Sequence, residues 1–492
     1  MIVALFSLLF GFQDSTTPTR VILKEAVLPI PVEKAWGLWA DSKGAASYGV
    51  PKAANIELVP GGKYEIYFSM DPPEGERGSE GCHVLSFNPY RMISFTWNAP
   101  PSLVALRKAN VRTQVNVFFE EVPEGTKVHL IQHGLGVGKE WDQYGEYFDK
   151  AWQLVFNAQK DWAAKQPKSP PSMLTEYQSL YTDGAVEVSY TRYERARFRM
   201  NIPATSAKVW RAIATSDGFN ETFGVKAAIE LKPGGKYDIW GGKGNTVLAF
   251  TTQQMLSVSG SAPEKFPNVK KGGTWGTYFI ESTGTSTCTL TLETAGWRRG
   301  DDEFEKAFDY FLRANPKFLN MLYTRLGGSR LPPAPDRMER EINAPVSEVW
   351  KFFTSNDGLK QWMATQVEME ALKPGAKIRT RYGADGKPGD AGGIEHTILC
   401  VEPERLFAFQ CTKQPEKFPF KEAIKNVYFV LHLEPIGSER TLLTMTTVGY
   451  TNDTESQQLR AFFEEGNSQT FDSLRAAVAR NRPSRGSTSI RR

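Results

Sequence analysis

The chain has 492 residues, which is more than usually folds around one hydrophobic core, and this length predicts about three domains. With 40% hydrophobic, 23% charged and 12% aromatic residues, it has the composition of ordinary folded protein. A net charge of +4 gives no general attraction for polyanions, so we expect no nucleic-acid partner. The four cysteines are too few for a disulfide scaffold and show no C-x-x-C spacing, which favours free, buried thiols.

The first element along the chain is an apolar segment from Ile2 to Phe12. It is too short to span a bilayer as a helix, and no other stretch could do so, so we expect no transmembrane segment. The segment suits the apolar core of a signal peptide cut near Asp14, although no Lys or Arg precedes it. We assign 1–19 to such a peptide and a spacer, and expect a periplasmic or secreted protein. A cytoplasmic protein with a buried N-terminal segment is the alternative.

A helix with one buried face is predicted three times. In each case an apolar residue comes directly before a tryptophan, and a second apolar residue comes three positions after the tryptophan. This is the spacing of one helical face. The segments are "PVEKAWGLW" (31–39), "TSAKVWRAI" (205–213) and "PVSEVWKFF" (345–353). Pro31 and Pro345 suit a helix start.

A Pro-Gly turn and a strand follow each helix at nearly equal spacing. The turns open "VPGGKYEIYF" (59–68), "KPGGKYDIW" (232–240) and "KPGAKIRTRY" (373–382). A type II turn needs glycine at its third position, where the chain has Gly61, Gly234 and Gly375. Ala376 holds the fourth position, which needs no special backbone, so the third turn should fold like the others. Alternation after the turn predicts inward-facing Tyr64, Ile66 and Phe68, and likewise Ile378, Thr380 and Tyr382.

Each copy then has hairpin-like strands and closes on a long helix. The middle copy has only "GGKGN" where the others have "SMDPPEGERGSEG" and "GADGKPGDAGG", so one hairpin should be shorter there. The pattern predicts α+β architecture with three tandem domains, each an antiparallel sheet wrapped around a long C-terminal helix. We place them at 20–165, 186–327 and 337–482, with linkers at 166–185 and 328–336 and a basic tail at 483–492.

This order of elements resembles the helix-grip fold of the START-like (SRPBCC) superfamily. Within it, the motifs are similar to domains related to the C-terminal part of the activator of the heat-shock-protein-90 ATPase. The carrying motifs are the proline-led helix starts, the P-G-G turn, the P-x-R-L/M hairpins at 89–92 and 403–406, and Gly296–Trp297. Copy two departs from the pattern, because Gln253-Gln254-Met255 replaces the Pro-x-Arg hairpin. Members of this superfamily include co-chaperone domains, lipid carriers and cyclases, so the resemblance implies a fold more than a reaction.

Three functions remain open from the sequence. The one we favour is non-catalytic binding of a small apolar molecule or lipid, without a cofactor, in a cavity between sheet and helix. The alternatives are an interaction or co-chaperone-like module with a protein partner, and a cyclase-like or hydrolytic enzyme. The expected ligand-binding residues are Tyr64, Ile66, Phe68, Phe148, Trp152, Phe156, Tyr237, Ile378, Tyr382, Phe463 and Phe471.

Reactive side chains give weaker signals. His129 and His133 have the spacing of a helical metal pair but fall on a predicted strand, so we expect no metal site there. Symmetric folding of the hairpin around 402–405 places His396 opposite Cys411 and Cys400 opposite Phe407. A Cys-His dyad is therefore conceivable, but a plain cross-strand pair is favoured, and we assign no catalytic residue.

We predict that limited proteolysis cuts first within 166–185 and 328–336, because few contacts should cross a domain boundary. Peptide mass mapping of an early time course would locate the cuts. Early cleavage inside 200–320 would contradict the proposed division.

Overall fold

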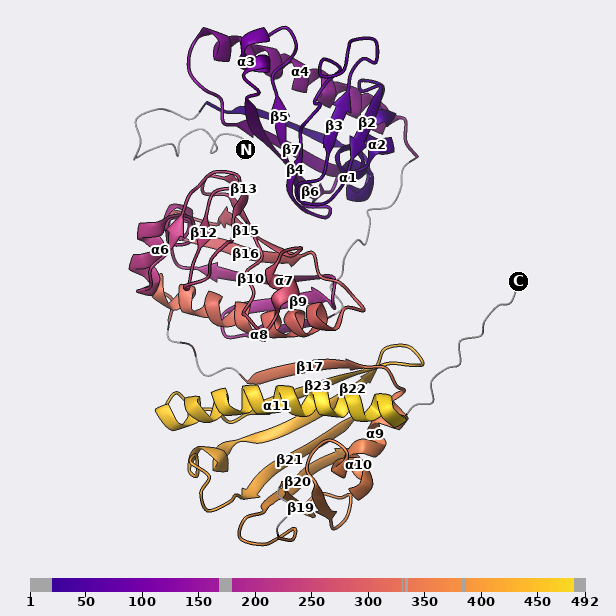
Figure 1. The fold of residues 1–492 in the computed structure, drawn as a ribbon, viewed down its shortest axis with the longest axis vertical. Helices are drawn as coiled ribbons and strands as arrows, with labels where there is room; N and C mark the ends of the chain where they lie inside the picture. The colour runs from indigo at the N-terminus through magenta and orange to yellow at the C-terminus, as the bar shows by residue number, and fades with distance from the viewer. Residues whose placement is uncertain (1–19, 168–178, 330, 332–334, 383–385, 482–492) are drawn as a thin grey trace, which may run out of the picture. The chain divides into compact units, whose positions relative to one another are not determined.

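The computed structural model describes residues 20–167, 179–329, 331, 335–382 and 386–481 (Figure 1). The predicted signal peptide at 1–19 lies outside the described residues. None of the helices in the described ranges has both the length and the apolar character that a membrane span requires.

Contacts group the chain into two compact units. Unit 1 comprises Met1–Gln178 and Ala204–Gly296, and unit 2 comprises Ser179–Pro203 and Trp297–Arg492. We call the predicted ranges 20–165, 186–327 and 337–482 the first, middle and third repeat. Their boundaries stay a prediction.

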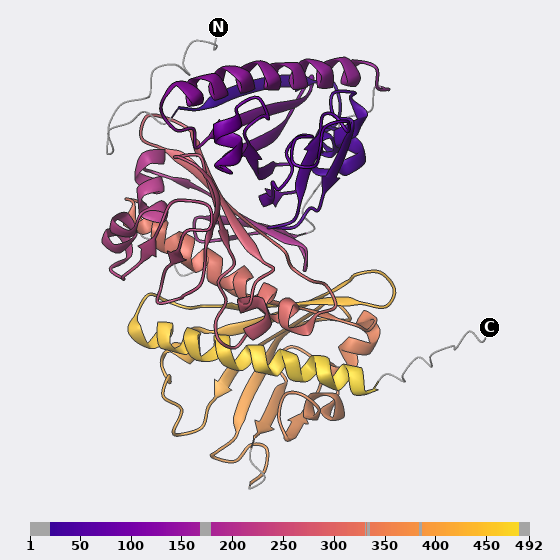
Figure 2. The same cartoon turned by 45° about the horizontal axis from the view of Figure 1, so that its top comes forward.

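In unit 1, the first repeat has a five-stranded antiparallel sheet with the order β1-β7-β6-β5-β4, and β2 pairs separately with β3. The long helix α4 lies across one face of this sheet (Figure 2). The elements are β1 (Ile22–Leu28), α1 (Val32–Ala40), α2 (Ser42–Ser47), β2 (Ala53–Ile56), β3 (Tyr64–Tyr67), β4 (Val84–Asn88), β5 (Met92–Asn98), α3 (Val104–Lys108), β6 (Arg112–Val122), β7 (Gly125–His133) and α4 (Lys139–Ala164).

Unit 1 also contains the central part of the middle repeat, in which neighbouring strands follow the order β13-β14-β15-β16. Its elements are α5 (Ser206–Ala214), α6 (Ser216–Phe223), β11 (Ala228–Ile229), β12 (Tyr237–Asp238), β13 (Val247–Thr251), β14 (Met255–Ser259), α7 (Pro267–Lys270), β15 (Trp275–Ser282) and β16 (Cys288–Ala295).

Unit 2 contains the third repeat, whose seven-stranded sheet has the order β17-β23-β22-β21-β20-β19-β18 and carries the long helix α11 on one face (Figure 1). It also includes β8 (Ser179–Asp183), which falls within the predicted linker 166–185, and from the middle repeat β9 (Val186–Thr191), β10 (Arg195–Ile202) and α8 (Asp302–Arg325). The third repeat comprises β17 (Asp336–Ile342), α9 (Val346–Thr354), α10 (Asn356–Lys360), β18 (Gln366–Met369), β19 (Lys377–Arg381), β20 (Ile394–Glu402), β21 (Leu406–Lys413), η1 (Ala423–Asn426), β22 (Tyr428–Pro435), β23 (Thr441–Val448) and α11 (Thr454–Asn481). The α+β class with tandem helix-grip domains is confirmed.

The three Pro-Gly turns have the predicted conformation. Gly61, Gly234 and Gly375 have φ angles of 83°, 75° and 84°, in the left-handed region that favours glycine. Each amide donates to a carbonyl of a later strand, at 2.7–2.8 Å. Ala376 is 5% exposed and its amide closes the turn on Lys373, so the third turn folds like the others.

The hairpins share a one-residue bulge that the sequence analysis missed. The register shifts between Val84 and Ser86 and at the matching places in β13 and β20, which leaves Leu85, Leu248 and Leu399 as bulge residues. The predicted pairing of Cys400 with Phe407 is therefore wrong, because the bulge brings Cys400 opposite Ala408.

The shorter hairpin of the middle repeat is confirmed. Only residues 239–246 join β12 to β13, whereas 68–83 and 382–393 join the corresponding strands of the other repeats.

Candidate functional site

A small aromatic pocket between β3, β5, α1 and α4 lies where the sequence predicts a ligand cleft in the first repeat. Tyr64 and Ile66 are buried in it, and Phe68, which is 37% exposed, lies at its mouth. The remaining lining residues are Leu38, Trp39, Ala45, Tyr48, Phe95, Trp97 and Trp152. The space between these side chains is about 10 Å³, which is the lower limit for one water molecule.

Aromatic contacts explain why so little space remains. The rings of Tyr64 and Phe95 stack with centroids 3.8 Å apart, and Trp97 lies 5.0 Å from Trp152 of α4. The ring centroids of Phe148 and Trp97 are 6.4 Å apart, and those of Phe156 and Trp39 are 6.0 Å apart. Phe148 and Trp152 therefore contact a strand residue and Phe156 contacts helix α1, and together these rings occupy the space between sheet and helix.

The inward tyrosines do not provide an acid or a base. Tyr64 donates its hydroxyl to the Trp39 carbonyl at 2.9 Å, and Tyr237 of the middle repeat donates to the Ile213 carbonyl at the same distance. Burial raises the pKa of both tyrosines well above the usual range. Both hydroxyls therefore stay protonated, and each ties a strand to the helix before it.

Polar atoms without partners mark the region around Tyr48 and Trp39. Gln159 is 0% exposed on the helix face that also presents Trp152 and Phe156, yet neither atom of its amide makes a hydrogen bond of normal geometry. The Tyr48 hydroxyl interacts with this amide, although burial still raises the pKa of Tyr48 strongly. The indole Nε1 of Trp39 is also buried without a partner. Such groups are rarely left unpaired in folded proteins.

The third repeat places its predicted site residues less uniformly. Ile378 and Phe471 are core residues at 0% and 2% exposure, and Phe463 packs on Phe429 with centroids 5.2 Å apart. Tyr382 is 60% exposed rather than inward-facing, because β19 ends at Arg381 and the sheet no longer fixes its direction. The buried Thr380 Oγ1 has no hydrogen-bond partner.

His396 and Cys411 face each other as predicted but do not form an activated dyad. Burial lowers the pKa of His396 to about 4, against the opposing effect of Glu395. Burial raises the pKa of Cys411 to about 11, and its thiol donates to the Lys413 carbonyl at 3.4 Å. A neutral imidazole beside a protonated thiol is a cross-strand pair. Among the described residues, no group of three or more His, Cys, Asp or Glu side chains could hold a metal ion.

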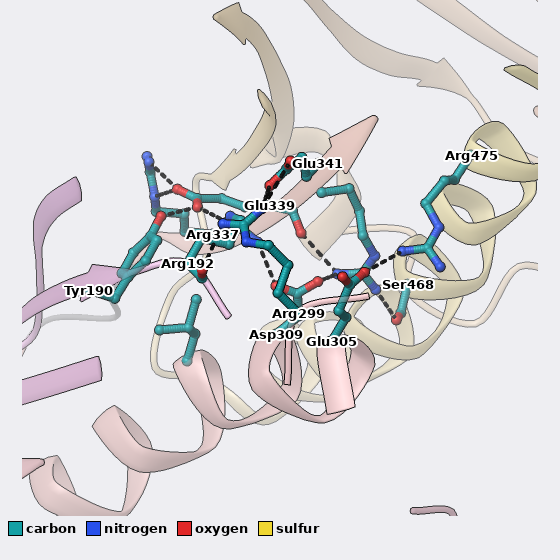
Figure 3. A network of polar contacts seen from close by, with 12 residues as sticks. Tyr190, Arg192, Arg299, Glu305, Asp309, Arg337, Glu339, Glu341, Ser468 and Arg475 are labelled. Atoms are coloured by element: carbon teal, nitrogen blue, oxygen red, sulfur yellow. Dashed lines mark hydrogen bonds and ion pairs between the residues drawn. The ribbon is translucent and has the colours of Figure 1, made fainter. Parts of the chain in front are cut away.

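Unit 2 contains a buried ionic network that the sequence analysis did not predict (Figure 3). Asp309 of α8 accepts from Arg192 at 2.6 Å and from Arg340 of β17 at 3.0 Å. Glu339 pairs with Arg192 and also accepts a hydrogen bond from the Tyr190 hydroxyl. These charges are 2–5% exposed as residues, so they join middle-repeat elements to the third repeat away from water.

The network keeps Glu339 ionised. Burial alone would raise the pKa of Glu339, but Arg192 and Arg337 lower it, with help from the Tyr190 hydroxyl. Arg340 extends the network to Asp472 and Ser468 of α11. A signal was present in the sequence "DRMEREI" (336–342), whose charges occupy both faces of a strand that can be solvated on one face at most.

Comparisons with known proteins find one matching family and several similar structures. The family model described as Activator of Hsp90 ATPase homolog 1-like protein matches residues 29–160 and 343–479. The chain is similar to the Aha1 dimer from Colwellia psychrerythraea, with 19% identity over 30% of this chain and 96% of that chain, at a TM-score of 0.25. It is also similar to the di-domain ARO/CYC BexL from the BE-7585A biosynthetic pathway, with 15% identity over 59% of this chain and 99% of that chain, at a TM-score of 0.23. A third structure is norcoclaurine synthase from Thalictrum flavum in complex with dopamine and hydroxybenzaldehyde, with 11% identity over 30% of this chain and 88% of that chain, at a TM-score of 0.24. A search of curated proteins finds no match.

We predict that Asp309→Ala strongly destabilises unit 2, because it leaves Arg192 and Arg340 buried without this carboxylate. The expected loss is about 3–5 kcal/mol of unfolding free energy, measured by denaturant titration. The control Asp149→Ala removes a carboxylate that pairs with Lys24 at 2.9 Å while 61% exposed, and should cost less than about 1 kcal/mol. Equal losses in both variants would contradict a special role for the network.

We predict that His396 stays neutral until the pH falls well below 6.5. Because its folded pKa is lowered to about 4, the unfolded chain takes up this proton first, and stability is lost as the pH falls from about 6.5 to about 4. An NMR titration of the imidazole signals would follow the proton, and His396→Asn would assign the signal. A midpoint near 6.5 would show that this ring is accessible to water.

Proposed function

Since this chain belongs to the family of Activator of Hsp90 ATPase homolog 1-like proteins, we propose that its first repeat binds a small, largely apolar molecule with one hydrogen-bonding group. The observation that carries the proposal is an aromatic pocket in which the buried Nε1 of Trp39 has no partner, together with the buried amide of Gln159, which interacts with the pocket residue Tyr48 only outside normal hydrogen-bond geometry. A ligand of this kind would place its apolar part among the rings and its polar group beside Gln159.

A ligand group that hydrogen-bonds the Gln159 amide would supply affinity that apolar burial alone would lack. Covering roughly 300 Å² of apolar ligand surface contributes about 7 kcal/mol, from which association subtracts at least ~4 kcal/mol. A buried polar group without a partner costs about 1–3 kcal/mol, and a ligand that pairs with Gln159 recovers part of it. We therefore expect micromolar or weaker binding that depends on the polar group.

Binding requires the pocket to open. The existing space of about 10 Å³ cannot hold an organic molecule, so side chains at the mouth have to move. Phe68 is suited to this movement because it is 37% exposed and follows the last residue of β3. Because only open molecules can bind, the apparent dissociation constant equals that of the open state divided by the fraction of molecules that are open.

The two alternatives have less support in unit 1. A co-chaperone-like module that binds a partner through its sheet would need a free outer face, but strands of the middle repeat cover that of the first repeat. An enzyme would need an acid or base in the pocket, whereas burial keeps the hydroxyls of Tyr48 and Tyr64 protonated. Binding without chemistry is consistent with both observations.

The test compares 1-naphthol with naphthalene, which share an apolar body and differ by one hydroxyl. Quenching of tryptophan fluorescence would report binding, because Trp39, Trp97 and Trp152 line the pocket. We expect 1-naphthol to bind about tenfold more tightly than naphthalene to the native protein. Gln159→Leu should remove this difference and raise the unfolding free energy by ~1 kcal/mol, since leucine needs no hydrogen bond.

The matched control is Gln153→Leu, which makes the same replacement at an exposed position of α4. It should change neither ligand's affinity. Equal binding of the two ligands, or unchanged 1-naphthol binding in Gln159→Leu, would refute the polar anchor. If neither ligand binds, the pocket is purely structural and the interaction-module alternative is favoured.

A further inference from the structure

In unit 1, strands of the first repeat pack against strands β13–β15 of the middle repeat, and we call the two faces that meet in this contact the outer faces. Met92 of the first repeat shares one buried cluster with Ala249, Met255 and Phe279 of the middle repeat. The hydroxyls of Ser86 and Ser257 lie 2.5 Å apart across the same contact. Each of the two faces is thus shielded from solvent by the other.

The contact has approximate two-fold symmetry. Gln114 of the first repeat donates to the Phe250 carbonyl at 3.0 Å, and Trp275 of the middle repeat donates to the Phe87 carbonyl at 2.7 Å. Phe87 and Phe250 each follow the bulge leucine by two residues. Gln114 and Trp275 also occupy equivalent positions, each four residues before the phenylalanine opposite Met92 or Met255. Each face therefore makes the same bond to the other, as in an isologous pair.

The third repeat has the same face, but it is open. Its bulge leucine, Leu399, is 42% exposed. Tyr428, which is equivalent to Gln114 and Trp275, is 40% exposed. Leu406 and Val430 between them are only half-buried. This apolar face therefore has the same strand register as its two counterparts, but here these residues are partly exposed to solvent.

Charged residues at its edge indicate which partner fits. In unit 1, Arg91 pairs with two acidic residues of the middle repeat, Glu293 at 2.7 Å and Glu281 at 3.0 Å, and the third repeat has Thr446 in place of Glu293 and Glu434 in place of Glu281. Arg405 is the residue before β21, just as Arg91 is the residue before β5. Glu434 lies two residues after His432 in β22, and Glu281 lies two residues after Phe279 in β15. One face of the third repeat therefore carries both members of the pair, so two copies would form the pair twice. Arg405 now bonds Glu402 in an exposed pair, which costs little to exchange.

We propose that this open face binds the same face of a second copy of the chain, giving an isologous homodimer. Arg405 of each copy pairs with Glu434 of the other, and Tyr428 donates to the Val401 carbonyl, the position equivalent to Phe87 and Phe250. Leu399 and Leu406 supply the apolar centre. The inference is independent of the proposed ligand pocket.

Sedimentation velocity of the full chain from about 1 to about 100 μM tests the dimer. We expect concentration-dependent dimerisation, and a dissociation constant raised at least ~10-fold by Arg405→Glu and by Glu434→Arg, because each places like charges together twice. The double variant R405E/E434R restores opposite charges and should restore the dimer. Leu399→Asp should also abolish it, whereas Leu154→Asp, at an exposed leucine of α4, should not.

Circular dichroism of each variant checks the fold, which should persist because Arg405, Glu434 and Leu399 are all exposed. A native chain that stays monomeric throughout the range would overturn the proposal. So would a dimer that withstands both charge reversals, or a double variant that remains monomeric.

Discussion

An antiparallel sheet has two faces, and in this chain the long helix covers only one of them. The helix side is apolar and aromatic, as the contacts of Trp39 and Trp97 with α4 show. The outer side must therefore be polar, or be buried against something else. Much of the remaining organisation follows from how each repeat meets this constraint. In unit 1 the solution is mutual cover, in which serine hydroxyls, amides and a methionine cluster fill one contact.

The helix side determines what the first repeat can bind. Large rings stabilise the grip of the helix, but they also occupy the space that a ligand would need. The result is a nearly filled pocket, and the main departures from a well-packed core are the buried Nε1 of Trp39 and the amide of Gln159, neither of which makes a hydrogen bond of normal geometry. A site of this type would favour selectivity over strength, because a ligand without the polar group leaves the amide unpaired.

Local signals in the sequence predicted local structure well. The helix starts after Pro31 and Pro345, the turns at Gly61, Gly234 and Gly375 and the short middle hairpin follow from residue-level preferences that act over a few positions. Alternation also identified Tyr64 and Ile66 as inward-facing. It failed at Tyr382, which lies just beyond the strand, and at Cys400, where a bulge shifts the register.

Long-range packing could not be predicted in the same way. Charges along 336–342 occupy both faces of the strand, but they do not reveal that Arg192 and Asp309, distant in sequence, lie beside them. Gln159 likewise resembles any polar residue of a helix until its burial is known. Alternation distinguishes the two faces of a strand, but it carries no information about which segment covers the outer one.

The open face of the third repeat has a consequence for stoichiometry. Each contact between outer faces buries two of them, so a chain with an odd number of such faces has one that remains exposed. Association through a single leftover face ends at two chains, because the resulting complex presents no further copy of it. An open filament would instead need two unpaired faces on each chain. Losing or gaining one such sheet during evolution would switch the chain between a self-contained molecule and a paired one.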